Sequence, residues 1–244
     1  MTRIDDRPRF PRIKVCGVTR EQDVVMLAEE GVDTIGINLV HSSPRGVSLA
    51  KASKLAEVAL SCRLQVIAVV MNPSRDELKQ VLAAAPWDAV QLHGQESVDL
   101  ATNCENIPVI KAVSWSGRAE EREMAKTWQR VFHRSGANPP PGEPSVSPHL
   151  WGILIDAYAP VTGGGTGRTA RWDLLAPRPA ELTGVPLMLA GGLRPDNVAA
   201  AIAVTRPQGV DTASGVEESP GIKSRQRVRQ FVAAVDEVRD AIVQ

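Results

Sequence analysis

The chain has 244 residues, of which 43% are hydrophobic, and its 28 Lys and Arg residues balance its 28 Asp and Glu residues. This length and composition support one large α/β domain with a sizeable core. The balanced charge gives no general attraction for nucleic acid or an anionic membrane, and no apolar run reaches the roughly 18 residues that span a bilayer. Any anionic ligand must therefore be held by a local site.

The three cysteines, Cys16, Cys62 and Cys104, are odd in number and widely spaced. This pattern fits neither a disulfide framework nor a C-x-x-C metal clip. Residues 1–12 are charged and lack the apolar core of a signal peptide. We therefore expect a cytoplasmic protein whose site holds no metal.

Short apolar runs rich in β-branched residues alternate with amphipathic stretches of helix length. The first unit is a strand over 13–18 and a helix over 21–30. Ser48 is expected to cap the second helix, and Ser74 with Glu77 forms a capping box for the third. The eight predicted strands cover residues 13–18, 34–40, 65–71, 89–92, 109–113, 152–155, 186–190 and 209–213.

Strands that are apolar almost throughout are buried on both faces, which favours a parallel sheet. Eight βα units in about 250 residues are typical of a closed (β/α)₈ TIM barrel, with an open doubly wound sheet as the alternative. We expect a single barrel domain over 13–244 after an extension over 1–12. Successive prolines predict an exposed insertion at about 132–149, after the fifth helix and before the sixth strand.

In a TIM barrel the loops after the strands build the active face. Cys16 ends the first predicted strand and Asp156 ends the sixth. A thiol and a carboxyl group facing each other across the barrel mouth suit a general base and a general acid that act on one small molecule. The alternative is a small core residue at Cys16 and a capping or ion-pairing carboxylate at Asp156.

Small residues follow the last two strands, with Gly191 and Gly192 after the seventh and Ser214 and Gly215 after the eighth. Backbone N–H groups at such positions approach an anion closely, and many barrels bind phosphate there. The pattern predicts a phosphorylated substrate, with tight turns required by packing as the alternative. The glycine-rich run over 162–169 is expected to form a mobile loop over the site.

Four further polar residues are candidates for binding the substrate. Arg45, in the loop after the second strand, suits a carboxylate because its guanidinium donates two parallel hydrogen bonds. Gln91 and His93 end the fourth strand, and a single histidine favours hydrogen bonding over a metal site. Asp211 is expected either to orient hydroxyl groups of the substrate or to pack inside the barrel.

Taken in order, these motifs resemble the phosphoribosylanthranilate isomerase family of tryptophan biosynthesis. The resemblance implies a TIM barrel that needs no cofactor and converts N-(5'-phosphoribosyl)anthranilate into an aminoketose phosphate by an Amadori rearrangement. It makes Cys16 the general base and Asp156 the general acid, gives Arg45 the anthranilate carboxylate, and assigns the phosphate to Gly191, Gly192, Ser214 and Gly215. The matching segments are Lys14-Val15-Cys16-Gly17-Val18-Thr19, Ser43-Pro44-Arg45, Val90-Gln91-Leu92-His93-Gly94, Ile155-Asp156, the run over 164–169, Leu189-Ala190-Gly191-Gly192-Leu193 and the run over 214–223.

The chemistry places a demand on the thiol. With a pKa of about 8.5 a free cysteine is only a few per cent thiolate near pH 7, which costs about 2 kcal/mol of barrier. The barrel must therefore lower the pKa of Cys16, and Lys14 is expected to lie too early on its strand to do so. Asn38 departs from the family pattern, which has an apolar or aromatic residue there.

Two other functions remain open from the sequence. One is a related barrel isomerase acting on another phosphoribosyl amine, although such sites resemble a pair of aspartates and Cys16 argues against it. The other is a barrel that binds phosphate ligands without turnover. In each case the expected partner is a small phosphorylated molecule, neither nucleic acid nor membrane, and the protein is a monomer or homodimer.

Overall fold

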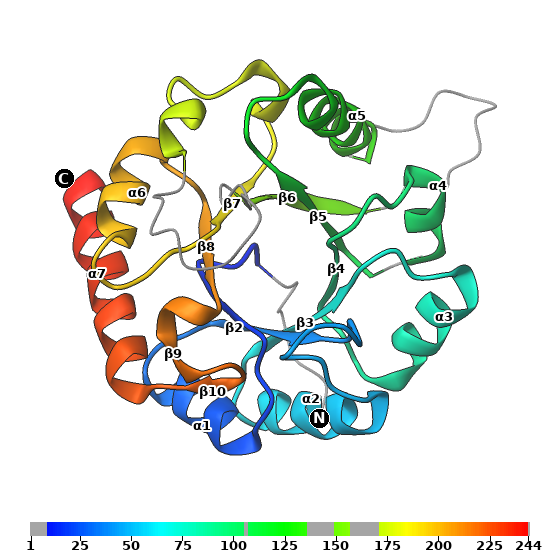
Figure 1. Ribbon diagram of the computed structural model, residues 1–244, viewed down its shortest axis with the longest axis vertical. Helices are drawn as coiled ribbons and strands as arrows, with labels where there is room; N and C mark the ends of the chain where they lie inside the picture. The colour runs from blue at the N-terminus through cyan, green and yellow to red at the C-terminus, as the bar shows by residue number, and fades with distance from the viewer. Residues whose placement is uncertain (1–8, 105–106, 136–148, 157–170, 244) are drawn as a thin grey trace.

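A computed structural model describes residues 9–104, 107–135, 149–156 and 171–243. Eight parallel strands follow one another around a closed barrel, and the last strand pairs with the first (Figure 1). The closure confirms the predicted TIM barrel and rules out the open sheet. The strands are β1 (Ile13–Cys16), β2 (Thr34–Asn38), β3 (Gln65–Val70), β4 (Ala89–Leu92), β5 (Val109–Ser114), β6 (Leu150–Asp156), β7 (Leu187–Ala190) and β8 (Gly209–Thr212).

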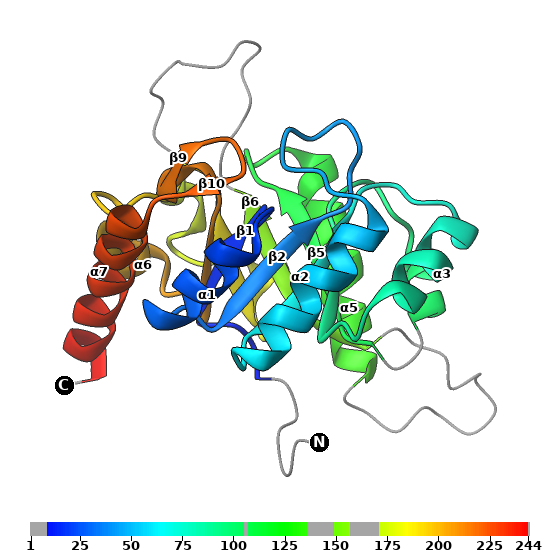
Figure 2. The ribbon, with the colours of Figure 1, turned by 90° about the horizontal axis from the view of Figure 1, so that it is seen from below.

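Helices surround the barrel, and an antiparallel two-stranded sheet follows β8 at the end where the strands finish (Figures 1 and 2). The predicted caps are confirmed, since Ser48 accepts from the backbone of Lys51 and Ser74 forms a capping box with Glu77. The α-helices are α1 (Glu21–Glu29), α2 (Leu49–Ser61), α3 (Arg75–Ala84), α4 (Val98–Ala101), α5 (Ala119–Ser135), α6 (Val198–Thr205) and α7 (Arg225–Val243). The shorter elements are the 3₁₀ helices η1 (Thr102–Cys104), η2 (Trp172–Leu175), η3 (Ala180–Leu182) and η4 (Ser214–Val216), and the strands β9 (Glu217–Ser219) and β10 (Ile222–Lys223).

Side chains alternate between two hydrophobic clusters, as the two-residue period of a strand requires. The larger cluster joins the outer face of the strands to the helices and includes Val15 of β1. The smaller one fills the barrel interior and includes Ala89 of β4 and Leu154 of β6. This alternation turns Cys16 of β1 and Asp156 of β6 toward the interior.

The amino-terminal end of the barrel is closed by residues that precede β1. The rings of Phe10 and Trp151 pack edge to face, with their centroids 5.9 Å apart. The backbone carbonyl of Arg12 accepts a hydrogen bond from the amide of Val210 at 3.0 Å. The described part of the N-terminus therefore lies at the end of the barrel opposite the β9–β10 sheet (Figure 2).

The predicted insertion starts too early in the chain. Residues 132–135 form the last turn of α5, because the partly buried ring of Phe132 extends the packed face of that helix against the core. The rest of the insertion, 136–148, and the glycine-rich run over 162–169 lie outside the described residues. The sixth strand begins at Leu150, two residues before its predicted start.

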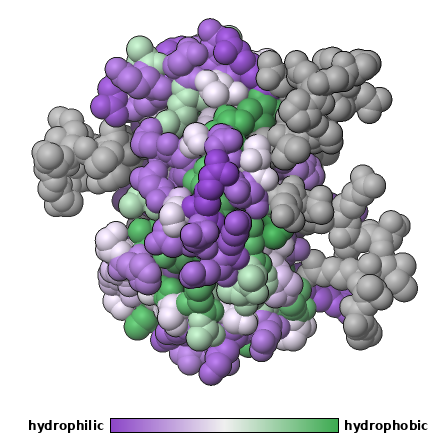
Figure 3. All heavy atoms as spheres, turned by 90° about the vertical axis from the view of Figure 1, so that its right-hand side faces the viewer, coloured by the Kyte–Doolittle hydropathy of each residue, from purple (hydrophilic) through white to green (hydrophobic). Residues whose placement is uncertain are grey.

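Among the described residues, no helix has both the length and the apolar character needed to cross a membrane. Hydrophilic side chains cover most of the described surface on the side of α3 and α4, with hydrophobic ones scattered among them (Figure 3). This distribution is ordinary for the surface of a folded domain.

Candidate active site

A cavity of about 360 Å³ lies where the barrel strands end. Cys16 and Asp156 both line it, so the structure places the thiol and the carboxyl group in one compartment. The described residues contain no cluster of three His, Cys, Asp or Glu side chains that would hold a metal ion. The cavity is lined by Cys16, His93, Asp156, Ala190, Gly191, Gly192, Leu193, Asp211, Thr212, Ala213 and Ser214.

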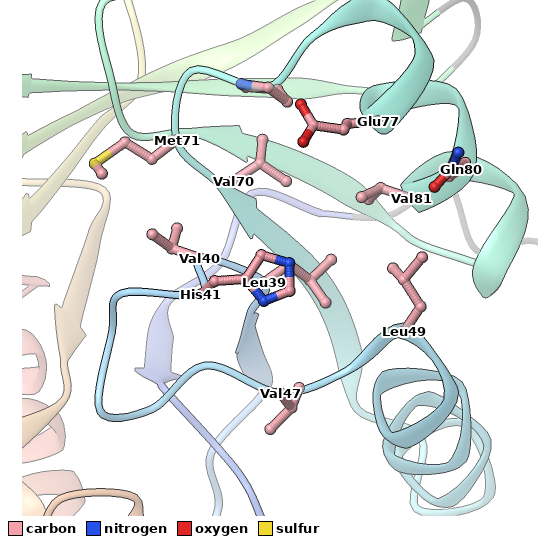
Figure 4. A pocket seen from close by; sticks show the side chains of 11 residues that line it. Leu39, Val40, His41, Val47, Leu49, Val70, Met71, Glu77, Gln80 and Val81 are labelled. Atoms are coloured by element: carbon pink, nitrogen blue, oxygen red, sulfur yellow. The ribbon is translucent and has the colours of Figure 1, made fainter.

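A second cavity, of about 250 Å³, lies between the loop after β2 and helix α3 (Figure 4). Leu39 and Leu49 line one side of it, and Val70 and Val81 line the other (Figure 4). None of the predicted site residues lines this largely apolar cavity. The phosphorylated, carboxylated substrate that the sequence analysis predicts would need charged and backbone donors, so we assign the candidate site to the cavity around Cys16.

Cys16 ends β1 beside a glycine of the neighbouring strand. Gly36 of β2 is the register partner of Cys16. A Cβ at Gly36 would lie 2.9 Å from the Cys16 sulfur and 3.0 Å from Nζ of Lys14. Only a glycine leaves both side chains in place, and the sequence analysis missed this requirement because it follows from strand register.

Lys14 lies beneath Cys16 inside the barrel. Its side chain is fully buried, and Nζ donates to Oδ1 of Asp211 at 2.9 Å. Burial, the largest effect, raises the pKa of the Cys16 thiol above its ordinary value, and the nearby Lys14 ammonium opposes this rise without reversing it. The expectation that Lys14 lies too early was therefore wrong, because residues two apart on a strand share a face and the four-carbon side chain spans the distance between them. The lowered pKa that the sequence analysis expects for Cys16, however, is not found in the structure.

The side chains of Gln91, on β4, and His93, the residue that follows β4, are joined by a hydrogen bond. Nε2 of Gln91 lies 2.7 Å from Nδ1 of His93, and Oε1 of the fully buried Gln91 has no hydrogen-bond partner among the described residues. Burial lowers the pKa of His93, and the charge of Asp156 opposes this effect. A neutral His93 that accepts at Nδ1 carries its proton on Nε2. His93 lines the cavity, whereas Gln91 supports it from beneath.

Arg45 lies over Gly17, at the edge of the site. A Cβ on Gly17, which has φ +71°, would lie 2.3 Å from Cδ of Arg45. Glu217 of β9 accepts from Nε of Arg45 at 2.8 Å and from Nη2 at 2.6 Å. Burial alone would raise the pKa of Glu217, but the hydrogen bonds from Arg45 and Lys223 lower it. Arg45 is thus a held cation next to the cavity, although it is not one of the residues that line it.

Asn38 shapes the loop that carries Arg45. Nδ2 of Asn38 donates to Oγ of Ser43 at 3.0 Å, and its Oδ1 accepts from the amide of Val40 at 2.8 Å. Oγ of Ser43 also accepts from the amide of Arg45 at 3.2 Å. The polar residue that departs from the family pattern therefore has a structural reason in this chain.

The two glycine-containing turns meet at the far side of the cavity. Gly191 and Gly192 adopt left-handed conformations, with φ of +91° and +66°, and both line the cavity beside Ser214. A Cβ at Gly215 would lie 1.9 Å from the carbonyl oxygen of Leu193. Packing of the two turns therefore requires Gly215, and the same packing presents the turns to the cavity.

Comparisons with known proteins agree with this geometry. The model of the N-(5'-phosphoribosyl)anthranilate (PRA) isomerase family matches residues 13–135 and 142–234. N-(5'-Phosphoribosyl)anthranilate isomerase of Myxococcus xanthus is 40% identical over 227 residues, which cover 93% of this chain and 97% of that protein. The crystal structure of phosphoribosyl anthranilate isomerase from Thermotoga maritima has a TM-score of 0.75 at 31% identity, covering 93% of this chain and all of the other. A structure of a phosphoribosyl anthranilate isomerase in complex with reduced 1-(o-carboxyphenylamino)-1-deoxyribulose 5-phosphate has a TM-score of 0.73 at 30% identity, with 93% and 100% coverage.

Proposed function

The chain belongs to the family of PRA isomerases and is itself an isomerase, and we propose that it rearranges N-(5'-phosphoribosyl)anthranilate with Cys16 as general base and Asp156 as general acid. The observation that carries this assignment is that the two groups line one cavity together with the turns after β7 and β8. Converting an aminoaldose to an aminoketose oxidises C2 while it reduces C1. The reaction is therefore internally balanced.

Substrate binding divides between the turns that line the cavity and the guanidinium of Arg45 beside it. The phosphate accepts hydrogen bonds from the backbone N–H groups of Gly191, Gly192, Ser214 and Gly215, where small residues allow close approach. The anthranilate carboxylate takes Arg45, whose Nε and Nη2 are engaged by Glu217, which leaves Nη1 for the substrate. The related complex with a carboxyphenylamino deoxyribulose phosphate supports a ligand with these two anionic ends.

The acid step opens the sugar ring. Asp156 donates a proton to the ring oxygen, the bond between C1 and that oxygen breaks, and the lone pair of the amine nitrogen forms an iminium. The resulting carboxylate shares the cavity with His93. With burial keeping its pKa low, His93 is a neutral N–H donor that supports the ionised acid or a sugar hydroxyl.

The base step completes the redox exchange. The thiolate of Cys16 takes the proton from C2, and the electrons of that bond neutralise the iminium to give an enolamine. Tautomerisation places a proton on C1 and a carbonyl group at C2. Asp211 lines the same cavity and is within reach of a sugar hydroxyl, although its Oδ1 already accepts from Lys14.

Kinetics of two variants test these roles. We expect Cys16→Ala and Asp156→Asn each to lower kcat by about 10²–10⁴-fold, while binding of the reduced carboxyphenylamino deoxyribulose phosphate stays close to wild type. Cys62→Ala, at the carboxyl end of α2, is the matched thiol control and should keep full activity. Turnover at the wild-type rate in either of the first two variants would contradict the assignment.

Complementation tests the substrate itself. The wild-type chain should restore growth of a tryptophan auxotroph that lacks this isomerase, and neither Cys16→Ala nor Asp156→Asn should do so. Failure of the wild-type chain would favour another phosphoribosyl amine as substrate. The place in tryptophan biosynthesis, the cytoplasmic location and the monomer or homodimer state stay predictions.

A further inference from the structure

Two buried lysine–carboxylate pairs flank Cys16. Lys14 reaches Asp211 of β8 at 2.9 Å from beneath the thiol. Lys223 of β10 reaches Glu217 at 2.7 Å and also donates to the backbone carbonyl of Cys16 at 2.6 Å. Both lysine side chains are fully buried. Two ammonium groups from opposite ends of the sequence therefore lie close to Cys16, one near its thiol and one at its backbone carbonyl.

The position of Gly36 shows how close Lys14 is to the sulfur. The Cys16 sulfur and the Lys14 Nζ both lie within 3.0 Å of the point that a Cβ at Gly36 would occupy. The two groups thus converge over the same glycine. Lys223 meets Cys16 through its backbone, which fixes the end of β1 as well as adding charge.

Stability alone does not account for these pairs. A buried ion pair is often no more stabilising than well-packed apolar side chains of similar volume, because both charges lose their hydration. Elsewhere the barrel interior is filled by apolar residues such as Ile110 and Met188. The gathering of two such pairs around one thiol therefore indicates a chemical role, since a neighbouring ammonium favours a thiolate over a thiol.

We propose, on the premise that Cys16 is the base, that Lys14 and Lys223 are positioning residues whose ammonium groups favour the thiolate of Cys16 against the cost of its burial. The ion pairs with Asp211 and Glu217 hold these two lysines in place. Deprotonation of the thiol releases its proton to solvent, and no electron transfer is involved.

The charges around the thiol act in opposite directions. Burial is the largest effect and leaves the pKa of the Cys16 thiol above its ordinary value; Lys14 lowers this pKa, Asp211 raises it and Lys223 lowers it. Burial alone would lower the pKa of Lys14, but its interactions with Asp211 and Cys16 raise it, so Lys14 stays an ammonium. Arg45 is a third cation facing the thiol, and His93 and Asp156 are the other titratable groups that line the same cavity.

Alkylation of Cys16 by iodoacetamide, followed by mass spectrometry as a function of pH, measures the thiolate directly. Lys14→Met and Lys223→Met should each slow alkylation near pH 7 by about tenfold and move its midpoint to higher pH. Asp211→Asn should do the opposite, with faster alkylation and a midpoint at lower pH. A merely structural role would not give shifts of opposite sign for the two partners of one ion pair.

A third buried lysine provides the matched control. Lys111 is as buried as Lys14 and is paired with Glu96 at 2.7 Å, but its other hydrogen bonds go to the carbonyl groups of Leu92, at the end of β4, and Gly94. Lys111→Met should leave the Cys16 midpoint unchanged. Cys62 and Cys104 are resolved by their own peptides, and burial raises the pKa of Cys104 to about 12.

Thermal unfolding of each variant shows whether it folds. If Lys14→Met does not fold, Asp211→Asn decides, because it keeps an oxygen acceptor for Lys14 while removing the negative charge. Unchanged midpoints in the folded Lys→Met variants, or a higher midpoint in Asp211→Asn, would overturn the inference. Alkylation does not require turnover, so an active Cys16→Ala variant would reject the proposed function and leave this result standing.

Discussion

Replacing Gly36 by alanine tests the geometry of the base. The new Cβ would lie 2.9 Å from the Cys16 sulfur and 3.0 Å from Nζ of Lys14. Because nonbonded heavy atoms pack at about 3.5–4.0 Å, the sulfur must retreat by roughly 0.6–1.1 Å. A misplacement of about 1 Å at a reacting group costs on the order of 100-fold in rate. We therefore expect kcat of Gly36→Ala to fall by about 10–100-fold.

The same substitution also affects stability. Forcing an extra methyl group into a packed interior costs about 1–3 kcal/mol, which for a chain of this size lowers Tm by about 2–4 °C per kcal/mol. Gly31→Ala separates the two effects, since Gly31 has φ +85° and its nearest neighbour would be 3.7 Å from the new Cβ, on Val232 of α7. That control should lose Tm and keep kcat. A Gly36→Ala enzyme with wild-type kcat would refute the placement of Cys16.

Arg45→Lys should raise KM by about tenfold with little change in kcat, because an ammonium replaces neither the hydrogen bonds to Glu217 nor a planar grip on a carboxylate; an unchanged KM would remove Arg45 from the site. Lys111→Met should lower the free energy of unfolding by about 3–5 kcal/mol, since it leaves Glu96 buried without its partner, and Lys111→Met/Glu96→Gln should recover most of the loss. Burial alone would raise the pKa of Glu96, but the charge and hydrogen bond of Lys111 lower it from 4.5. The stability that this pair contributes is therefore complete above pH 4.5 and is lost as the pH falls through the lower folded-state pKa of Glu96. Urea unfolding of the wild type and the double variant, near neutral pH and at about pH 3, measures this loss.

The fold was predictable from local signals. The alternation of apolar strands with amphipathic helices gave eight units, and each predicted strand lies within two residues of the observed one. The caps at Ser48 and Ser74 were predictable because a cap is a contact between residues three apart. The end of α5 was not, since whether a helix continues through residues 132–135 depends on what Phe132 packs against.

Residues of the site that end strands were predictable for the same reason. The end of a parallel strand in a barrel always faces the mouth, so the sequence placed Cys16, Asp156 and Ser214 without knowledge of packing. Glu217 and Lys223 were missed as partners of Arg45 and Cys16, because these contacts join segments more than 170 residues apart in the chain. No local pattern shows which carboxylate meets a given guanidinium.

Lys14 is a different case from both the strand-end residues and the long-range partners. Strand geometry alone could have placed its side chain beside Cys16, and the sequence analysis still judged it too far away. Side chains two residues apart on a strand share a face, so the residue before the last inward one lies directly beneath it. Counting back two from Cys16 gives Lys14, and counting back two from His93 gives Gln91. Both are polar and fully buried, and the register pairs Lys14 with Asp211 on the neighbouring strand. A polar residue in this second position has no apolar packing role, so in a strand that ends in a reactive group it indicates support for that group.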